Sequence, residues 1–182
     1  MSKIAVFFGE GFEEIEALTV VDMCRRAGIE VNMVSITGND IVTGAHKIPV
    51  GMDMQFEDVD FDTVDMIVLP GGMPGTRNLE AHAGLMAQVD AFNAAGKYLA
   101  AICAAPSIFG HRGILKGRMA CCFPGFEKDL EGATVLTTRV TQDDHVFTSR
   151  GMGTAMDFAL AIVALFCGEE VATEKAKSII YE

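Results

Sequence analysis

The stretch Lys97-Tyr-Leu-Ala-Ala-Ile-Cys-Ala-Ala-Pro-Ser107 decides the fold. It is apolar through Ile102, turns at Cys103, continues in small residues and enters a predicted helix after Ala105. A cysteine on such a sharp strand-to-helix turn projects from the top of a sheet, as in a nucleophile elbow. The stretch therefore predicts one strand–turn–helix unit of an α/β protein, with Cys103 at its turn.

Strand-like and helix-like segments alternate through the rest of the chain. Short apolar strands separated by helices predict a mostly parallel sheet with helices on both faces. We expect a single α/β domain over residues 1–182, doubly wound in the flavodoxin-like manner, with ligands at the carboxyl ends of its strands. The predicted strands are 3–8, 30–36, 65–69, 97–102, 118–122, 134–136 and 145–148, a hairpin is predicted at 40–50, and the predicted helices are 13–27, 83–95, a segment after 105, 154–167 and 170–179.

The composition excludes several classes of function. Half of the 182 residues are hydrophobic, which supports a sizeable core and argues against disorder. The net charge of −11 and the lack of any Lys/Arg cluster argue against nucleic-acid binding. No apolar run reaches the roughly 18 residues of a membrane span, and the N-terminus leads directly into a predicted strand instead of a signal peptide. We expect no nucleic-acid and no membrane partner.

The five cysteines predict a reducing environment. Their number is odd, and the spacing of Cys24, Cys103, Cys121, Cys122 and Cys167 fits neither a disulfide framework nor a zinc site. Reduced thiols in the cytoplasm are the simplest interpretation. Cys24 and Cys167 lie in apolar helical patterns and are predicted core residues. Cys121 and Cys122 would point to opposite faces of a strand, which leaves open that one of them faces the ligand-binding crevice. Two buried small residues are the favoured interpretation.

Cys103 has two possible roles at its turn. The predicted helix behind it supplies unpaired N–H groups and the positive end of a dipole, which favour a thiolate. A free cysteine is also among the most buried residue types, so a small core residue is the alternative. The turn alone leaves both open.

Glu16 is the second candidate site residue. On a helical wheel for residues 13–27, Glu14 and Asp22 fall on one side, and Glu16 falls on the opposite side with Val20 and Met23. A carboxyl group in a buried face is costly unless it is neutral or paired, and burial raises its pKa. A protonated Glu16 would donate a hydrogen bond to a thiolate and share one proton with it. The alternative is an acidic first helical turn, which suits Glu14 better than Glu16.

Three loops follow predicted strand ends and are expected to meet in one crevice. They are Gly9–Phe12, Pro70–Gly75 and the turn at Cys103. Backbone N–H groups at Gly71 and Gly72 would be able to bind an oxyanion, although glycine pairs after strands are commonly only tight turns. The four histidines, including His111 two helical turns beyond Cys103, have no spacing that indicates a metal site or a catalytic dyad.

Taken together, the sequence resembles the ThiJ/PfpI superfamily, within it the branch of the parkinsonism-associated protein deglycase. The resemblance covers nearly the whole chain and implies a flavodoxin-like fold, a homodimer and an easily oxidised cysteine. It makes Cys103 the nucleophile, Glu16 its carboxyl partner, and the backbone at Gly72 and Ala104 the oxyanion donors. The motifs are Gly11-Phe-Glu-Glu-Ile-Glu16, Arg25-Arg-Ala-Gly-Ile29, Val68-Leu-Pro-Gly-Gly72, Ala101-Ile-Cys-Ala-Ala-Pro106, Thr148-Ser-Arg-Gly-Met-Gly-Thr-Ala155 and Asp157-Phe-Ala-Leu-Ala-Ile162.

The sequence departs from family patterns at three positions. Ala104 replaces the histidine that follows the cysteine in PfpI-type peptidases, so a Cys-His peptidase dyad is not supported. Phe123, before Pro124, replaces a histidine found in some deglycase-branch members, which removes a candidate proton shuttle. Ala105 replaces a glycine common after the elbow, which matters only if a positive φ is needed there.

The resemblance implies cysteine-dependent, cofactor-free glyoxalase or deglycase chemistry on reactive carbonyls such as methylglyoxal. In this hypothesis Cys103 adds to the aldehyde, Glu16 moves the proton, and no metal or organic cofactor is required. The alternative is a redox sensor or stress-protective protein in which an oxidant converts Cys103 to sulfenic and then sulfinic acid. A third possibility is a structural homodimer with an inert Cys103.

Overall fold

The computed structural model describes residues 2–181 as an α/β structure built on a twisted sheet. Within these residues the sheet has seven strands in the order β10-β11-β7-β6-β1-β2-β5. All neighbouring pairs are parallel except β10 and β11, which form an antiparallel edge. The strands are β1 (Lys3–Phe8), β2 (Glu30–Ser35), β5 (Met54–Gln55), β6 (Met66–Leu69), β7 (Tyr98–Ile102), β10 (Val140–Asp143) and β11 (Val146–Ser149).

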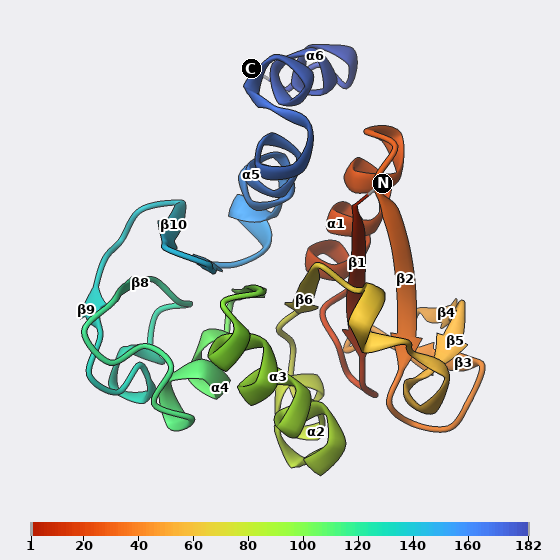
Figure 1. Ribbon diagram of the computed structural model, residues 1–182. Coiled ribbons are helices and arrows are strands. Elements are labelled where there is room, and N and C mark those ends of the chain that lie inside the picture. The colour runs from red at the N-terminus through yellow and green to blue at the C-terminus, as the bar shows by residue number, and fades with distance from the viewer. Residues whose placement is uncertain (1, 182) are drawn as a thin grey trace.

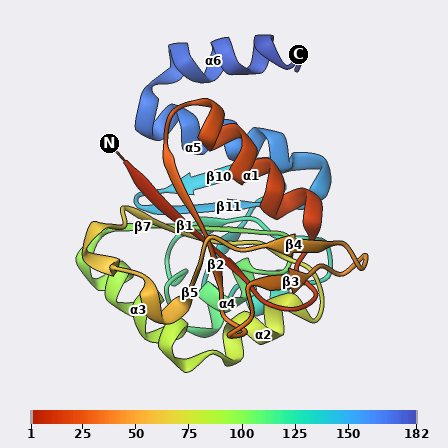
Figure 2. The same cartoon turned by 90° about the vertical axis from the view of Figure 1, so that its right-hand side faces the viewer.

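Helices cover both faces of this sheet, as Figures 1 and 2 show. Along β1, Ile4, Val6 and Phe8 pack on one side against α1 and α5, whereas Ala5 and Phe7 pack on the other side. This alternation follows from the two-residue period of a strand. The helices are α1 (Glu14–Arg26), α2 (Gly75–Ala81), α3 (Ala83–Ala95), α4 (Pro106–His111), α5 (Ala155–Cys167) and α6 (Glu169–Ser178).

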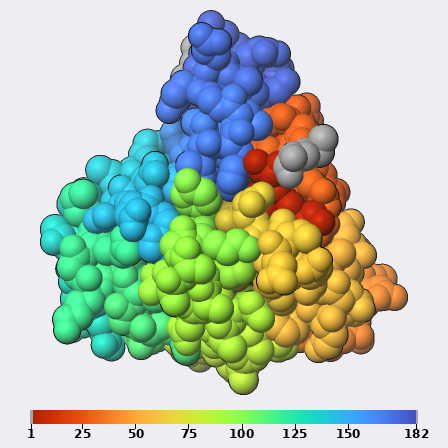
Figure 3. All heavy atoms as spheres, in the orientation of Figure 1, coloured from red at the N-terminus to blue at the C-terminus, as the bar shows by residue number. Residues whose placement is uncertain are grey.

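Two small sheets and four short 3₁₀ turns complete the described residues. The hairpin of β3 (Ile41–Thr43) and β4 (Pro49–Gly51) lies beside the start of α1, and β8 (Met119–Ala120) pairs with β9 (Thr134–Val135) in parallel. The C-terminal residues, in blue, form the top of the molecule in the space-filling view (Figure 3). The 3₁₀ turns are η1 (Phe56–Asp58), η2 (Phe61–Thr63), η3 (Glu127–Asp129) and η4 (Met152–Thr154).

The predicted fold class is confirmed, and its ligand-binding edge can be located. After β1 the chain moves to β2 on one side of the sheet, and β6 then adds on the other side of β1. The strand order reverses between β1 and β6, and in open α/β sheets ligands bind at the carboxyl ends of the strands at such a switch point. The loops after β1, β6 and β7 begin at this edge.

The elements that the sequence did not predict are short or polar. Helix α2 begins at Gly75, directly after a stretch rich in glycine and proline, which predicts a loop. Strand β10 has the sequence Val-Thr-Gln-Asp and is fixed by antiparallel pairing with β11. The predicted strands at 118–122 and 134–136 form only the small β8–β9 sheet.

Among residues 2–181, no helix combines the length and the apolar character needed to span a bilayer.

Candidate active site

The three loops expected to converge are joined by backbone hydrogen bonds. The N–H of Glu13, after β1, donates to the carbonyl of Gly71, after β6, over 2.9 Å. The N–H of Gly75 donates to the carbonyl of Gly11 over 3.1 Å. The N–H of Cys103, after β7, donates to the carbonyl of Ser149 at the end of β11 over 3.0 Å. The site is therefore built from the carboxyl ends of four neighbouring strands.

Cys103 occupies a strained turn. Its φ is +66°, in the left-handed region that residues other than glycine rarely adopt. Hydrogen bonds on both sides of the residue hold this conformation, because its N–H is bound by Ser149 and its carbonyl accepts the N–H of Phe123 over 2.9 Å. Backbone strain that the surrounding structure maintains is typical of functional sites. The predicted elbow at Cys103 is thus present, and its side chain is half-buried.

Glu16 is fully buried on α1, as its helical face predicts. Its Oε2 accepts a 2.9 Å hydrogen bond from the N–H of Gly71. Its own N–H donates to Oε2 of Glu13 over 2.7 Å, and Glu13 in turn binds the Gly71 carbonyl. The three residues form a closed ring of hydrogen bonds that fixes the carboxyl group of Glu16. Among the described residues, Oε1 of Glu16 has no partner within ordinary hydrogen-bond geometry, and the Cys103 thiol is the neighbouring side chain that acts on this carboxyl group.

Gly71 separates the thiol from the carboxyl group. A Cβ atom built on Gly71 would lie 2.6 Å from Cβ of Cys103 and 2.6 Å from Oε2 of Glu16. Only glycine fits between the two side chains, so their close approach depends on Gly71. Gly72 has φ of +92°, and a Cβ there would collide with the backbone of residues 11–13. The glycine pair is therefore required by space as well as by backbone conformation.

Burial dominates the electrostatics of the pair. Burial raises the pKa of Glu16 from 4.5 to about 7. The interaction with the Cys103 side chain lowers this pKa, whereas the negative charge of Glu13 raises it further. The pKa of the Cys103 thiol is also raised, first by burial and then by the charge of Glu16 and the hydrogen bond to it. The N–H groups of Ala104 and Gly72 lower it, but they do not outweigh burial. This differs from the expectation that the helix behind Cys103 favours a thiolate.

The thiol pKa is raised and not lowered because the thiol is buried, the helix behind Cys103 is weak and the carboxylate of Glu16 is close. Helix α4 is short, with six residues, and two of the three effects that raise the thiol pKa come from Glu16. Both effects weaken when Glu16 carries the proton. We therefore expect the two groups to titrate as a coupled pair, in which a neutral carboxyl group at Glu16 favours a thiolate at Cys103.

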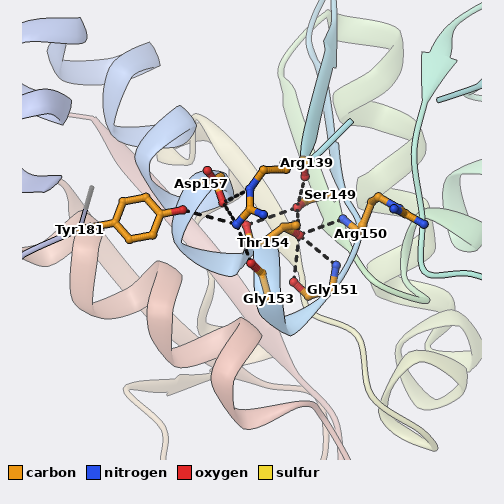
Figure 4. A network of polar contacts seen from close by, with 8 residues as sticks. All are labelled: Arg139, Ser149, Arg150, Gly151, Gly153, Thr154, Asp157 and Tyr181. Carbon is orange, nitrogen blue, oxygen red and sulfur yellow. Dashed lines mark hydrogen bonds and ion pairs between the residues drawn. The ribbon is translucent and has the colours of Figure 1, made fainter. Parts of the chain in front are cut away.

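A polar network holds the loop that brings Ser149 to Cys103 (Figure 4). Oγ1 of Thr154 accepts the N–H groups of Arg150 and Gly151 over 3.2 and 3.1 Å, and it lies 2.7 Å from Oγ of Ser149. Arg139 supports the loop from outside by donating to the carbonyl of Gly153 over 2.7 Å. From the sequence this segment was recognised only as one motif of the family resemblance. Its place in the site follows from the pairing of β11 with β7.

Of two further residues at the site, Phe123 was noted in the sequence only as a departure from a family pattern, and Glu13 was not identified as a site residue. A Cβ built on Gly151 would lie 3.1 Å from Cδ2 of Phe123 and 3.8 Å from Oε1 of Glu16, so Phe123 borders the site. Glu13 caps α1 and belongs to the hydrogen-bond ring. A negative charge at the start of a helix was the only available signal for Glu13. Ala105 has φ of −64°, so the alanine there causes no strain.

One prediction on the helical wheel of α1 is wrong. Glu14 was placed on the outer face, but it is buried because the β3–β4 hairpin covers it. His46 of that hairpin donates its backbone N–H to Oε1 of Glu14 over 2.8 Å, and its Nδ1 lies 2.9 Å from Oε2. The wheel considers contacts along one helix only, so it does not account for a hairpin that folds over it.

The remaining cysteines and His111 lie outside the site. Cys24, Cys121 and Cys122 are buried and Cys167 is half-buried, which agrees with their predicted structural roles. The side chain of Cys121 donates to the carbonyl of Thr148 over 3.3 Å. Nδ1 of His111 lies 2.6 Å from Oε1 of Glu80, on the outer surface between α2 and α4.

The fold and the site together define a class of protein: a doubly wound α/β protein with a cysteine on a nucleophile elbow beside a buried glutamate. A model of the DJ-1/PfpI family matches residues 2–165, and the chain belongs to this family. The resemblance to the ThiJ/PfpI superfamily and its deglycase branch is thereby confirmed.

Relatives and solved structures agree with this assignment. The chain is 32% identical to "Protein dj-1beta" of Drosophila melanogaster over 183 residues, covering 99% of this chain and 98% of that protein. It is 33% identical to "Glutathione-independent glyoxalase DJR-1.2" of Caenorhabditis elegans, covering 88% and 86%. It spans only 41% of the related "Protein DJ-1 homolog B" of Arabidopsis thaliana. The structure "Toxoplasma gondii DJ-1, oxidized" matches with a TM-score of 0.95 at 33% identity, over 100% of this chain and 99% of that one.

Proposed function

We propose that the protein is a cofactor-free, cysteine-dependent enzyme of the glyoxalase or deglycase type that acts on reactive carbonyls such as methylglyoxal. The observation that carries the proposal is the pairing of Cys103 on a strained elbow with the fully buried carboxyl group of Glu16. A buried carboxyl group with a pKa of about 7 is suited to accept and return protons near neutral pH. The named glyoxalase among the relatives supports the same chemistry.

The first half of the proposed reaction forms a covalent adduct. The thiol proton passes to Glu16, and the sulfur of Cys103 forms a bond to the aldehyde carbon of a 2-oxoaldehyde. The aldehyde oxygen becomes an oxyanion beside the N–H groups of Gly72 and Ala104, the same groups that act on the sulfur. Glu16 returns its proton to this oxygen, which gives a hemithioacetal.

The second half is an internal redox step followed by hydrolysis. Glu16 removes the hydrogen of the former aldehyde carbon as a proton, and the resulting enediol accepts a proton at the neighbouring carbon. The hydroxyl proton of the first carbon moves to the oxygen of its neighbour, so the first carbon is oxidised to a thioester by two electrons while the neighbouring carbon is reduced to an alcohol by two. No external oxidant takes part. Water then attacks the thioester, the carbon–sulfur bond breaks, and a 2-hydroxy acid and the free thiol are released.

Turnover of methylglyoxal to lactate tests this proposal. We expect the full chain to form lactate without added thiol, metal or cofactor, and we expect Cys103→Ser and Glu16→Gln each to reduce kcat by at least about a hundredfold. Cys24→Ser, a change at a cysteine outside the site, is the matched control and should retain turnover. Lactate formation that is unchanged in Cys103→Ser would contradict the proposal.

A second candidate function is a redox sensor or stress-protective protein, and Phe123 favours it. The aromatic ring occupies the position of a candidate proton-carrying histidine, which leaves Glu16 as the proton-transfer group of the proposed cycle. In this alternative a peroxide oxidises the Cys103 thiol to sulfenic acid with release of water, and a second peroxide gives sulfinic acid. Mass spectrometry after two or more equivalents of peroxide distinguishes the functions, because a sensor would form the sulfinic acid at Cys103 yet form no lactate.

The proposal also includes a cytoplasmic location and assembly as a homodimer, which follow from the cysteine usage and the family resemblance. The partner is a small aldehyde in the first function and an oxidant in the second. Sedimentation of the purified chain measures its oligomeric state directly.

A further inference from the structure

We propose that Phe123 selects uncharged 2-oxoaldehydes with a large apolar substituent, such as an aryl group, over small ones. This inference rests on the proposed function and specifies its substrate class. It depends on how Phe123 is attached to the site, how its ring lies beside Glu16, and which charges surround the pair.

The backbone of Phe123 is tied directly to the nucleophile. Its N–H donates a 2.9 Å hydrogen bond to the carbonyl of Cys103. The preceding residue, Cys122, is buried in the core and fixes the chain on the other side. The backbone of Phe123 is therefore fixed relative to the elbow at Cys103, as a residue that contacts a substrate requires.

The ring of Phe123 lies over the same glycine that borders Glu16. A Cβ built on Gly151 would be 3.1 Å from Cδ2 and 3.6 Å from Cε2 of Phe123, and 3.8 Å from Oε1 of Glu16. Cδ2 of Phe123 and Oε1 of Glu16 therefore both lie within 4 Å of the same point, the position that a Cβ of Gly151 would take. The ring and the carboxyl group therefore both border Gly151, and this border of the site is called the Gly151 edge.

At the Gly151 edge the side chain of Phe123 is partly exposed and can contact a ligand. Phe123 is 41% exposed although it adjoins a fully buried carboxyl group, and two neighbouring site loops also present large exposed side chains, Met73 at 41% and Met152 at 46%. Met73 follows Gly72 directly and Met152 follows Gly151. Met73 and Met152 border separate hollows, so Phe123 is the exposed apolar side chain that lies beside Glu16. Ligand sites combine such apolar side chains with a few polar groups.

The surrounding charges disfavour an anionic substrate. The carboxyl groups of Glu13 and Glu16 are buried beside the elbow, and the charge of Glu13 already raises the pKa of Glu16. Arg150 precedes Gly151, but its Nε lies 3.5 Å from the carbonyl of Cys122, directed at that carbonyl. A carboxylate or phosphate on the aldehyde would add a negative charge to this group of acids. An uncharged aromatic substituent would instead pack on the ring of Phe123.

The test compares phenylglyoxal with methylglyoxal in the full chain and in Phe123→Ala. We expect the ratio of the two kcat/KM values, phenylglyoxal over methylglyoxal, to fall about tenfold in the variant, because an aromatic contact and the apolar burial around it contribute roughly this much. Phe123→Leu keeps apolar bulk without a ring and should give an intermediate ratio. Met119→Ala removes another exposed apolar side chain from the same segment and should leave the ratio unchanged.

The possible outcomes separate this inference from the proposed function. A ratio unchanged in Phe123→Ala, or an equal fall in Met119→Ala, would overturn the selection by Phe123 while leaving the glyoxalase chemistry in place. If the unmodified chain converts neither aldehyde, the proposed function fails and this inference fails with it. A fall confined to the Phe123 variants, with methylglyoxal turnover retained, would confirm the inference.

Discussion

Gly71 donates its backbone N–H to Oε2 of Glu16 over 2.9 Å, and it does so from a position where a side chain would also touch Cys103. One residue thus orients the carboxyl group and leaves the space through which it reaches the thiol. Glu13 closes the same arrangement by binding the carbonyl of Gly71 and the N–H of Glu16. The carboxyl group of Glu16 is thus held by the loops that follow β1 and β6.

The first prediction concerns Gly71→Ala. The added Cβ would lie 2.6 Å from both Cys103 Cβ and Glu16 Oε2, so one of the two side chains must move. We expect a destabilisation of about 1–3 kcal/mol and a loss of most Cys103-dependent turnover. Urea unfolding and lactate formation measure the two effects. Gly153→Ala is the matched control, because a Cβ there meets nothing within 4 Å and should change neither quantity.

The second prediction separates thiol reactivity from turnover in Glu16→Gln. The charge of Glu16 and the hydrogen bond to it raise the pKa of the Cys103 thiol, so their removal should lower that pKa. Alkylation by iodoacetamide near pH 8, with the other four cysteines replaced, should therefore become faster, while lactate formation is lost with the proton carrier. Slower alkylation in the variant would show that Glu16 stabilises the thiolate instead.

The third prediction is a pH dependence of stability. The folded protein holds the Glu16 proton more tightly than the unfolded chain, since the pKa rises from 4.5 to about 7. This contribution is fully present below pH 4.5 and is lost as the pH rises through about 7. Between pH 5 and pH 8 the unmodified chain should lose about 2 kcal/mol more unfolding free energy than Glu16→Gln. Equal losses in urea unfolding at the two pH values would contradict the buried, protonated carboxyl group.

The fourth prediction concerns Glu13, which acts on the site through Glu16. Glu13→Gln keeps an oxygen that accepts the N–H of Glu16 but removes the charge that raises its pKa. We expect the Glu16 pKa to fall, so the acidic limb of the kcat/KM profile should move to lower pH with little change in stability. Glu13→Ala also loses the helix cap and should cost about 1 kcal/mol. A profile that does not move in Glu13→Gln would limit Glu13 to a capping role.

The elbow and the buried carboxyl group were predictable because local patterns encode them. An apolar strand followed by Cys103 and small residues specifies the turn, and the position of Glu16 on the apolar side of α1 indicates its burial. The contributions of Ser149 and Gly151 were not predictable, and Phe123 was noted only as the replacement of a family histidine. Their contacts depend on β11 lying beside β7 and on the segment after β8 folding back to the carbonyl of Cys103. No local period of the sequence encodes such contacts.

The loop from Ser149 to Thr154 leads to the last prediction, made for Thr154→Val. Valine has nearly the shape of threonine, but it lacks the oxygen that accepts the N–H groups of Arg150 and Gly151. Leaving these half-buried donors without a partner should cost about 1–3 kcal/mol and loosen the loop whose Ser149 carbonyl holds the N–H of Cys103. Because the strained φ of Cys103 depends on that bond, we expect kcat to fall more than the affinity for aldehyde changes. Thr154→Ser keeps the hydroxyl group and should restore both stability and kcat. If Thr154→Ser is as impaired as Thr154→Val, the methyl group and not the hydrogen bonds would hold the loop.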